Sequence, residues 1–272
     1  MDKFIKGIFA GAVALGGLYV LSTQGRTNHP GLAGLQGWKY AHRGLHDEFL
    51  PENSMGAFRA ALENGYGIEL DIHLTKDGKL AVIHDTSLKR TAGCDVKITD
   101  LTVEDLENYR LGGTDEKIPL FSQVLELFAG KAPLIIELKS DNNAPELVAA
   151  AVKIMEDYAG PYCMESFDPR CVLELKKQAP QVIRGQLTMD YFEEKDSKLP
   201  NAVKWILTQH AENILTMPDF VACRFSDRNV LGSKLARKFW GLQGVTWTLR
   251  SQEDFNTAVA EGWLPIFEGF KP

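Results

Sequence analysis

The sequence has few cysteines and no excess of basic residues. Of 272 residues only four are cysteines, none in a CxxC pair, so a disulfide framework is excluded. We expect all four to be buried thiols: Cys94, Cys163, Cys171 and Cys223. The 30 basic residues are outnumbered by 36 acidic ones, which argues against a surface that follows nucleic-acid phosphates. Any phosphate site must therefore be local. With 44% hydrophobic and 24% charged residues, the chain is typical of an ordinary folded protein.

One long apolar run is present, at the N-terminus. Residues 7–25 carry no charge, follow Lys3 and Lys6, and precede Arg26. Because a full membrane crossing needs roughly 20 apolar residues, this run is just long enough. We predict that residues 1–25 are an uncleaved membrane anchor, with a cleaved signal peptide as the alternative, and that residues 26–37 are a linker. The two N-terminal lysines favour a domain outside the cytoplasm.

From Trp38 onward, short β-branched or apolar runs alternate with helical patterns. This alternation is typical of βα units and a parallel sheet. The predicted strands are residues 39–43, 68–72, 134–139, 162–167, 182–187, 220–225, 245–249 and 264–268. Eight strands with intervening helices predict an α/β fold, a (β/α)₈ TIM barrel over residues 38–272, although a doubly wound open sheet has a similar pattern.

One segment interrupts this alternation after the second predicted strand. The sequence "HLTKDGKLAVIHD" predicts a hairpin around Asp77 and Gly78, and a long stretch follows before the next helix. Because a tight hairpin joins antiparallel strands, it cannot lie between two neighbouring strands of a parallel barrel. We therefore predict an inserted segment at about residues 73–118, and long excursions of this kind usually build function.

Acidic side chains alternate with apolar ones in two of the predicted strands. In "GIELDIHLT", Glu69 and Asp71 share one face, and in "LIIELKS", Glu137 and Lys139 do the same. In a barrel the apolar face meets the helices, so these polar side chains point inward, where paired carboxylates are costly unless a cation neutralises them. Oxygen ligands of this kind predict a divalent metal site, for Mg²⁺ or Ca²⁺.

Two histidines and two cationic side chains lie at the ends of predicted β segments, near these acids. His42 and Arg43 end the first strand, and His84 ends the hairpin. Two imidazoles can divide proton removal and proton donation, since their ordinary pKa lies near neutrality. Arg43 and Lys139 supply positive charge for a phosphoryl group. Together with a metal, these residues predict chemistry on a phosphate ester.

Several motifs occur in an order that resembles a known family. The stretches "HRG", "PENS", "ELDIHLTKDG", "VIHD" and "IELK", followed by "ESFDP" and "TWTL", are similar to those of the glycerophosphodiester phosphodiesterase family. The resemblance runs from residue 40 to about residue 250. It implies a TIM barrel, like that of phosphatidylinositol phosphodiesterases, that hydrolyses glycerophosphodiesters to sn-glycerol 3-phosphate and an alcohol.

The same resemblance implies a role for each of the predicted site residues. It implies that Glu69, Asp71 and Glu137 bind the divalent metal, that His42 and His84 are the acid-base pair, and that Arg43 and Lys139 hold the phosphate. It further implies that Glu52 lies beside the metal site and that Trp247 forms a wall of the glycerol pocket. The inserted segment would cap the active site.

The last predicted strand departs from the family pattern. "LPIFEGFKP" has neither the usual Asp-Gly nor the Thr-Asp-x-Pro ending. Two other functions remain open. One is a lysophospholipase D or phospholipase D activity on membrane lipids, which an anchor would favour. The other is a catalytically silent barrel that binds a phosphorylated headgroup.

Overall fold

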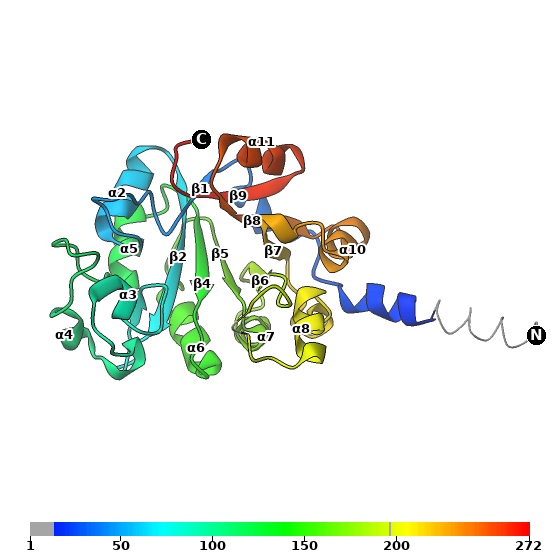
Figure 1. Cartoon of the computed structure of the whole chain (residues 1–272), viewed down its shortest axis with the longest axis horizontal. Coiled ribbons are helices and arrows are strands. Elements are labelled where there is room, and N and C mark those ends of the chain that lie inside the picture. The colour runs from blue at the N-terminus through cyan, green and yellow to red at the C-terminus, as the bar shows by residue number, and fades with distance from the viewer. Residues whose placement is uncertain (1–13, 196) are drawn as a thin grey trace, which may run out of the picture.

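Eight parallel strands form the centre of the molecule (Figure 1). The structure is a computed structural model and describes residues 14–195 and 197–272. A ninth strand, β3, pairs antiparallel with β2. The strands are β1 Tyr40–His42, β2 Gly67–Leu74, β3 Leu80–Val82, β4 Leu134–Leu138, β5 Tyr162–Ser166, β6 Arg184–Thr188, β7 Phe220–Arg224, β8 Gln243–Leu249 and β9 Trp263–Phe267. All eight predicted strands are therefore confirmed.

The sheet closes on itself through β1. This strand pairs in parallel with β2 on one side and with β9 on the other, where Tyr40 lies opposite Ile266 and Ala41 opposite Phe267. The unusual last strand thus completes the barrel. The prediction of a (β/α)₈ barrel is confirmed, and the doubly wound open sheet is excluded because such a sheet has two free edges.

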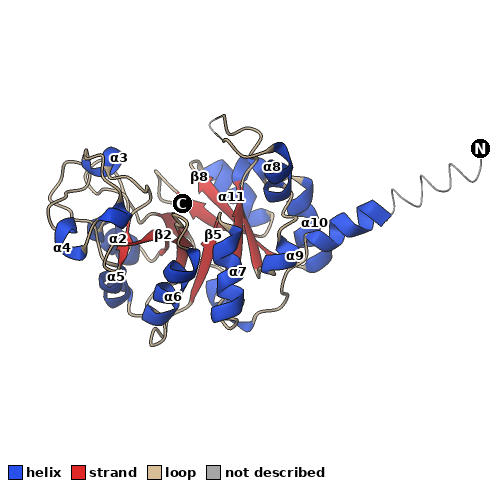
Figure 2. Cartoon of the chain, turned by 90° about the horizontal axis from the view of Figure 1, so that it is seen from below, coloured by secondary structure: helices blue, strands red, loops and turns tan. Residues whose placement is uncertain are grey.

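Helices surround the strands on the outside of the barrel (Figure 2). They are α2 Met55–Glu63, α3 Lys89–Ala92, α4 Val103–Leu106, α5 Phe121–Phe128, α6 Ala144–Ile154, α7 Pro169–Gln178, α8 Asn201–Thr208, α9 Asn213–Thr216, α10 Leu231–Trp240 and α11 Gln252–Ala260, with 3₁₀ turns at Pro30–Leu35, Ile98–Asp100 and Phe225–Asp227. The stretch "NAVKWILTQHAENI", residues 201–214, has the pattern of one helix, but the structure divides it between α8 and α9. The division falls at His210, whose φ of 54° is left-handed and interrupts a helix.

Side chains inside the barrel form two layers, one apolar and one polar. Alternate residues of each strand point inward. Tyr40, Ile135 and Phe220 belong to the apolar cluster that fills one end of the interior. Two residues further along the strands, at the next inward-facing positions, polar side chains occur: His42, for example, follows Tyr40 on β1. Because parallel strands run in the same direction, this polar layer lies toward their carboxyl ends, where barrel enzymes build their active sites.

The inserted segment contains β3, α3 and α4 and packs beside α2 and α5 (Figure 1). The predicted hairpin is present, with Gly78 in a left-handed conformation at φ 74°. The insertion has its own apolar core, which includes Ile83, Leu88 and Ile98. Cys94 lies in this segment and is exposed, so the prediction that all four cysteines are buried is wrong for this one. It follows Gly93, which ends α3, and lies in a loop rather than on a strand or helix that packs against the core.

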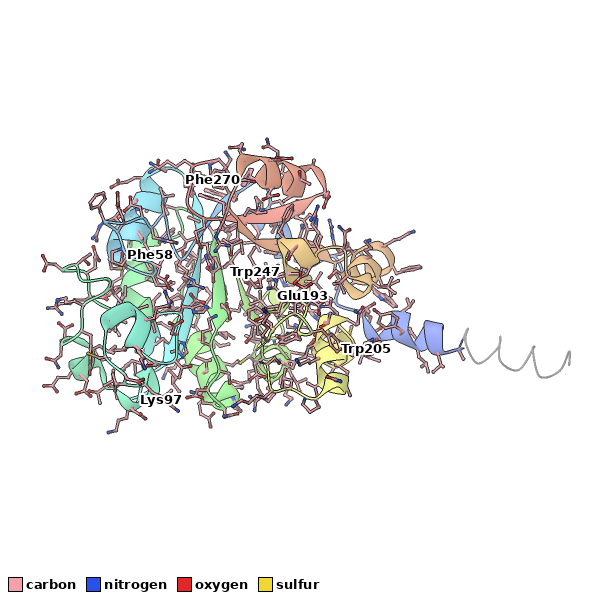
Figure 3. All side chains as sticks on the ribbon, viewed as in Figure 1. Phe58, Lys97, Glu193, Trp205, Trp247 and Phe270 are labelled. Carbon is pink, nitrogen blue, oxygen red and sulfur yellow. The ribbon has the colours of Figure 1, made fainter. Side chains whose placement is uncertain are left out.

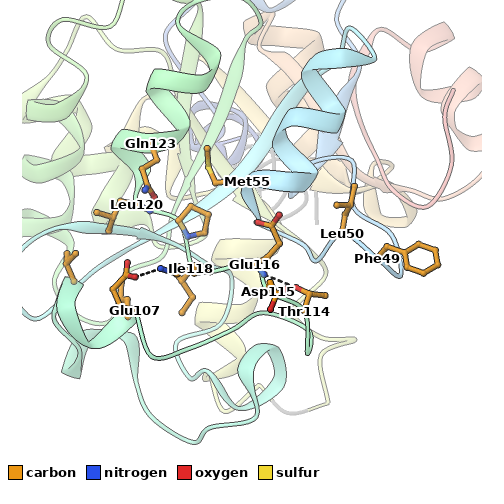
Figure 4. A pocket seen from close by; sticks show the side chains of 14 residues that line it. Phe49, Leu50, Met55, Glu107, Thr114, Asp115, Glu116, Ile118, Leu120 and Gln123 are labelled. Carbon is orange, nitrogen blue, oxygen red and sulfur yellow. Dashed lines mark hydrogen bonds and ion pairs between the residues drawn. The ribbon is translucent and has the colours of Figure 1, made fainter.

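A cleft of about 500 Å³ lies between the insertion and the barrel (Figure 4). The cleft is lined by Phe49 and Met55 and by residues 114–120, which include Glu116. It shares no lining residue with a second pocket, which lies at the polar end of the barrel and is lined by His42, Glu69 and Lys139 among others.

The N-terminal part of the described chain is a short helix over residues 14–22. Tyr19 packs against Trp205 of α8 with ring centroids 5.4 Å apart, and the Trp240 indole donates a hydrogen bond to the carbonyl of Val20. Among residues 14–195 and 197–272, no helix has both the length and the apolar character needed to span a membrane. The first half of the predicted anchor, residues 1–13, lies outside the described residues.

Candidate active site

Four carboxylates face the polar end of the barrel interior. The strand pairing places Asp71 beside Glu137, and Glu137 beside Glu165. Glu69 lies two residues before Asp71 and therefore shares its inward face. All four residues are buried, none being more than 7% exposed. The polar layer of the barrel is thus strongly acidic.

Three of these carboxylates form a group that fits a divalent metal. Glu69, Asp71 and Glu137 each offer one oxygen, and the three oxygens lie within 4.8 Å of one another. Burial and repulsion from neighbouring acids raise the pKa of Glu69 well above its ordinary value, and burial raises that of Glu137 to about 7. Such carboxylates lose their proton readily only beside a cation. Hard oxygen donors in this number suit Mg²⁺ or Ca²⁺.

Lys139 and Arg43 bring positive charge to the same acids. The Lys139 ammonium lies 2.7 Å from Glu137 Oε1 and 3.1 Å from Asp71 Oδ1. Arg43 Nε lies 3.5 Å from Asp71 Oδ2. Burial by itself would raise the pKa of Asp71, but the charges of Lys139, His84 and Arg43 outweigh it and hold this pKa below its ordinary value. Asp71 is therefore ionised, and the two cations are held where a phosphate could reach them.

The two predicted histidines lie at the rim of this acidic layer. His42 ends β1, and His84 follows β3 in the inserted segment. Burial lowers the pKa of both imidazoles. His42 Nε2 lies 3.9 Å from Glu69 Oε2, so one ring nitrogen faces the acidic group. Both histidines line the same pocket as Glu69, Glu137 and Lys139.

The backbone is strained beside the site. Arg43 and Asn53 both have φ at 55°, in the left-handed region that residues other than glycine rarely adopt. Asparagine tolerates this region better than other residues, but for Arg43 it costs on the order of 1–3 kcal/mol, and such strain clusters at functional sites. The Asn53 amide N–H donates to the carbonyl of Arg43 at 2.9 Å, which ties the two residues together. The Asn53 side chain donates to Asp71 Oδ2 at 2.8 Å.

Glu52 contacts arginines rather than the acidic group. Its carboxylate accepts a hydrogen bond from Arg43 at 2.8 Å and two from Arg90 of α3, at 2.7 and 2.9 Å. Glu52 therefore joins the loop after β1 to the inserted segment. It reaches the acidic layer through the side chain of Arg43.

The pocket above the acidic layer has a volume of about 330 Å³. Its other wall is apolar and consists of Phe167, Leu187, Met189, Trp247 and Ile266. Trp247 lies near the middle of the molecule (Figure 3), and its ring meets Phe167 edge to face with centroids 5.6 Å apart. His84 is the one described residue of the insertion that lines this pocket, so the insertion supplies a side chain to the rim.

Sequence reasoning missed four residues of this site. Asn53 lies within the quoted "PENS" stretch, but its hydrogen bond to Asp71 joins the loop after β1 to strand β2. Glu165 follows the same alternation in β5 as Glu137 in β4, which is a signal that could have identified it. Asp85 and Glu268 each stand against a histidine, at 2.6 and 2.5 Å.

The comparisons with known proteins agree with this geometry. The model of the "Glycerophosphoryl diester phosphodiesterase family" matches residues 42–267. A glycerophosphodiester phosphodiesterase of Bacillus altitudinis is 34% identical over 173 residues, which cover 59% of this chain and 70% of that protein. The lysophospholipase D GDPD1 of Rattus norvegicus is 36% identical over 131 residues, which cover 43% of this chain and 40% of that protein.

Solved structures show the same barrel. A phosphodiesterase from Oleispira antarctica, in complex with the product sn-glycerol-3-phosphate, superposes with a TM-score of 0.71 at 22% identity, over 89% of this chain and 95% of that one. A glycerophosphodiester phosphodiesterase from Thermotoga maritima superposes with a TM-score of 0.64 at 28% identity, over 84% and 92% of the two chains. Because the family match runs from His42 to Phe267 and so spans the barrel, the chain belongs to the glycerophosphoryl diester phosphodiesterase family.

Proposed function

We propose that this protein hydrolyses glycerophosphodiesters to sn-glycerol 3-phosphate and an alcohol. One observation carries the proposal: a single pocket is lined by buried glutamates of the acidic group, by the two cations and by the two histidines, a set that suits phosphodiester hydrolysis. The activity named for the family relatives supports the same reaction. A pocket of about 330 Å³ is of the size that takes a small ligand.

A divalent metal, Mg²⁺ or Ca²⁺, belongs to this proposal. Glu69, Asp71 and Glu137 would hold it, since their oxygens converge and their charges need a cation. When bound, such an ion stabilises negative charge on phosphoryl oxygens and orients the substrate.

The remaining roles fall to this chain's own side chains. Arg43 and Lys139 bind the non-bridging oxygens of the phosphate, Arg43 through its planar fork and Lys139 as a point charge. One of His42 and His84 accepts the proton of the attacking hydroxyl, and the other donates a proton to the leaving alcohol. Trp247 and Phe167 exclude water from the glycerol end of the pocket. The attacking hydroxyl is either water or the glycerol 2-hydroxyl, by way of a cyclic phosphate.

Release of glycerol 3-phosphate from glycerophosphocholine by the full-length chain tests this function. We expect release with Mg²⁺ or Ca²⁺ present and none after EDTA. The control is the same assay with Glu126→Gln, which changes an exposed glutamate of α5. Binding of the diester without any turnover would contradict the proposal and would support a silent phosphate-binding barrel.

A lysophospholipase D activity is the second candidate, because one wall of the pocket is apolar. Phe167, Met189 and Trp247 would accommodate part of a lipid chain. A lysophospholipase D is also among the relatives of this chain. The rates of hydrolysis of glycerophosphocholine and lysophosphatidylcholine at equal concentration distinguish the two candidates: the better substrate identifies the activity.

The N-terminal segment is proposed as a membrane anchor for the enzyme. Leu15, Leu18 and Leu21 follow one another at intervals of three residues in the helix over 14–22, and they are 70%, 62% and 47% exposed. They continue the uncharged sequence that begins at Gly7. Lys3 and Lys6 favour a cytoplasmic N-terminus, which would place the barrel on the other side.

Fractionation of cells that express the full chain tests this anchor. We expect the protein in the membrane pellet after a carbonate wash, and a chain that lacks residues 1–22 in the supernatant. Full-length protein in the supernatant would contradict the anchor. Because Cys94 is exposed and the other three cysteines are buried, its labelling in intact cells by a membrane-impermeant maleimide reports the side of the membrane.

A further inference from the structure

Glu268 stands beside His42 although 226 residues separate them in the chain. Glu268 directly follows β9, and His42 ends β1. These two strands are neighbours where the barrel closes, with Ala41 opposite Phe267. Because Leu264 and Ile266 point into the barrel interior, the alternation of the strand turns Glu268 toward the polar layer as well.

The contact between the two side chains defines which ring nitrogen of His42 carries the proton. Glu268 Oε2 lies 2.5 Å from His42 Nδ1. An ionised carboxylate can only accept a hydrogen bond, so Nδ1 must carry the proton and donate it. Nε2 is then the nitrogen that faces the site, 3.9 Å from Glu69 Oε2. This is the orientation that a histidine needs for proton transfer to or from a substrate.

Other groups hold the Glu268 carboxylate in place and keep it ionised. Arg250 donates to Glu268 Oε1 from Nη2 at 3.0 Å and from Nε at 3.2 Å. His46 Nε2 lies 3.8 Å from Oε2. Burial acts to raise the pKa of Glu268, but the hydrogen bond from His42 and the nearby side chains of His46 and Arg250 outweigh it and hold this pKa far below its ordinary value.

The second histidine of the site has the same arrangement. His84 Nδ1 lies 2.6 Å from Asp85 Oδ1, and Arg90 Nε donates to Asp85 Oδ2 at 2.7 Å. A carboxylate against Nδ1, backed by an arginine, therefore occurs twice at one pocket. The two copies come from unrelated parts of the chain: the neighbouring residue supplies the acid to His84, and the closing strand supplies it to His42.

We propose that Glu268 is a positioning residue for His42, which holds the proton on Nδ1 and directs Nε2 at the substrate. The inference rests on the proposed hydrolysis of glycerophosphodiesters. In this role Glu268 contacts neither the substrate nor the metal ligands. This role gives the last strand a function in this chain. The strand lacks the Asp-Gly and the Thr-Asp-x-Pro ending that are usual in the family.

Kinetics of Glu268→Ala and Glu268→Gln, in the full-length chain with metal present, test the inference. We expect Glu268→Ala to lower kcat about 10²-fold and to change KM less than threefold, because the ring loses its orientation while the substrate contacts remain. Glu268→Gln keeps an oxygen that accepts from Nδ1 and should recover part of this loss. The matched control, Glu253→Gln on the exposed surface of α11, should leave both constants unchanged.

A spectroscopic readout separates failure of this inference from failure of the proposed reaction. In ¹⁵N-labelled full-length protein, the His42 ring is assigned by comparison with His42→Gln, and its tautomer is read from the two nitrogen shifts. We expect protonated Nδ1 in the wild type and a mixed population in Glu268→Ala. If the wild type cleaves neither glycerophosphocholine nor lysophosphatidylcholine, the proposed function fails. The tautomer of His42 alone then decides the role of Glu268.

Two results would overturn the role of Glu268. One is a kcat in Glu268→Ala within threefold of the wild type. The other is a His42 tautomer that is the same with and without the Glu268 carboxylate.

Discussion

The side-chain amide of Asn53 donates a hydrogen bond to the carboxylate of Asp71 at 2.8 Å, and both residues are almost completely buried. Asn53 lies in the loop after β1, whereas Asp71 lies on β2. The bond orients a carboxylate of the proposed metal site from a neighbouring loop. The left-handed φ of 55° at Asn53 is one that asparagine tolerates better than other residues with a side chain.

Asn53→Ala should weaken metal binding without removing a metal ligand. Loss of a partner that orients a ligand typically costs about 10- to 100-fold in metal affinity or activity. We therefore expect the concentration of Mg²⁺ or Ca²⁺ for half-maximal hydrolysis to rise by that order. Asn64→Ala, at the exposed end of α2, is the control. Identical metal titrations for Asn53→Ala and the wild type would show that this bond does not position Asp71.

Metal binding should also be visible in the thermal stability of the protein. A ligand that binds only the folded state raises the melting temperature. We expect Mg²⁺ or Ca²⁺ to raise that of the wild type, and Glu137→Gln to lose most of the rise because it removes one of three converging carboxylates. Glu126→Gln on the exposed face of α5 should keep it. A full rise in Glu137→Gln would exclude this residue as a ligand.

Removal of either rim histidine should lower turnover strongly. General acid-base catalysis typically contributes about 10²- to 10⁴-fold, so His42→Ala and His84→Ala should each lose a factor of that order in kcat. His29→Gln, near the N-terminus, is the control, and its kcat should match that of the wild type. A loss of less than about tenfold in His42→Ala would be too small for an acid-base role.

A buried glutamate away from the site should make the stability depend on pH. Burial raises the pKa of Glu212 to about 8, and no hydrogen-bond partner of its side-chain oxygens is found among the described residues. The pKa of a glutamate in the unfolded chain is about 4.3, so between these two pKa values the folded state binds a proton that the unfolded state lacks. The free energy of unfolding should therefore fall as pH rises through this window, by at most about 1.4 kcal/mol per pH unit.

Urea unfolding at pH 6 and pH 8 measures this dependence. Glu212→Gln should be less sensitive to pH than the wild type over this range and should be the more stable of the two at pH 8. Glu193→Gln changes an exposed glutamate and should follow the wild type. Parallel wild-type and Glu212→Gln profiles would refute the assignment.

Gly232→Ala should destabilise the fold through a collision between backbones. A Cβ at Gly232, in α10, would lie 2.1 Å from the carbonyl oxygen of Gln209. Since a backbone atom cannot rotate away, the two segments must separate, at a cost of about 1–3 kcal/mol. Chemical unfolding measures the loss. Gly16→Ala, where a Cβ meets nothing within 4 Å, should cause none. Equal stability of the two variants would contradict the expected collision.

Much of the barrel could be predicted because strand patterns are local. Each of the eight parallel strands is marked by its own run of apolar or β-branched residues, and the alternation within two runs indicates which side chains point inward. Glu69, Asp71, Glu137 and Lys139 were identified in this way. The division between α8 and α9 was not predicted, because the left-handed backbone at His210 leaves no mark in a helical pattern.

The sequence by itself determined the barrel, its inward-facing acids and the two histidines, since periodicity along each strand is enough to assign a face. Only the tertiary structure decided which residues complete the site. The bond from Asn53 to Asp71 and the contact of Glu268 with His42 depend on strand pairing and on closure of the barrel through β1 and β9. Contacts of this kind join residues that no local pattern connects, because their distance is set by the packing of the whole chain.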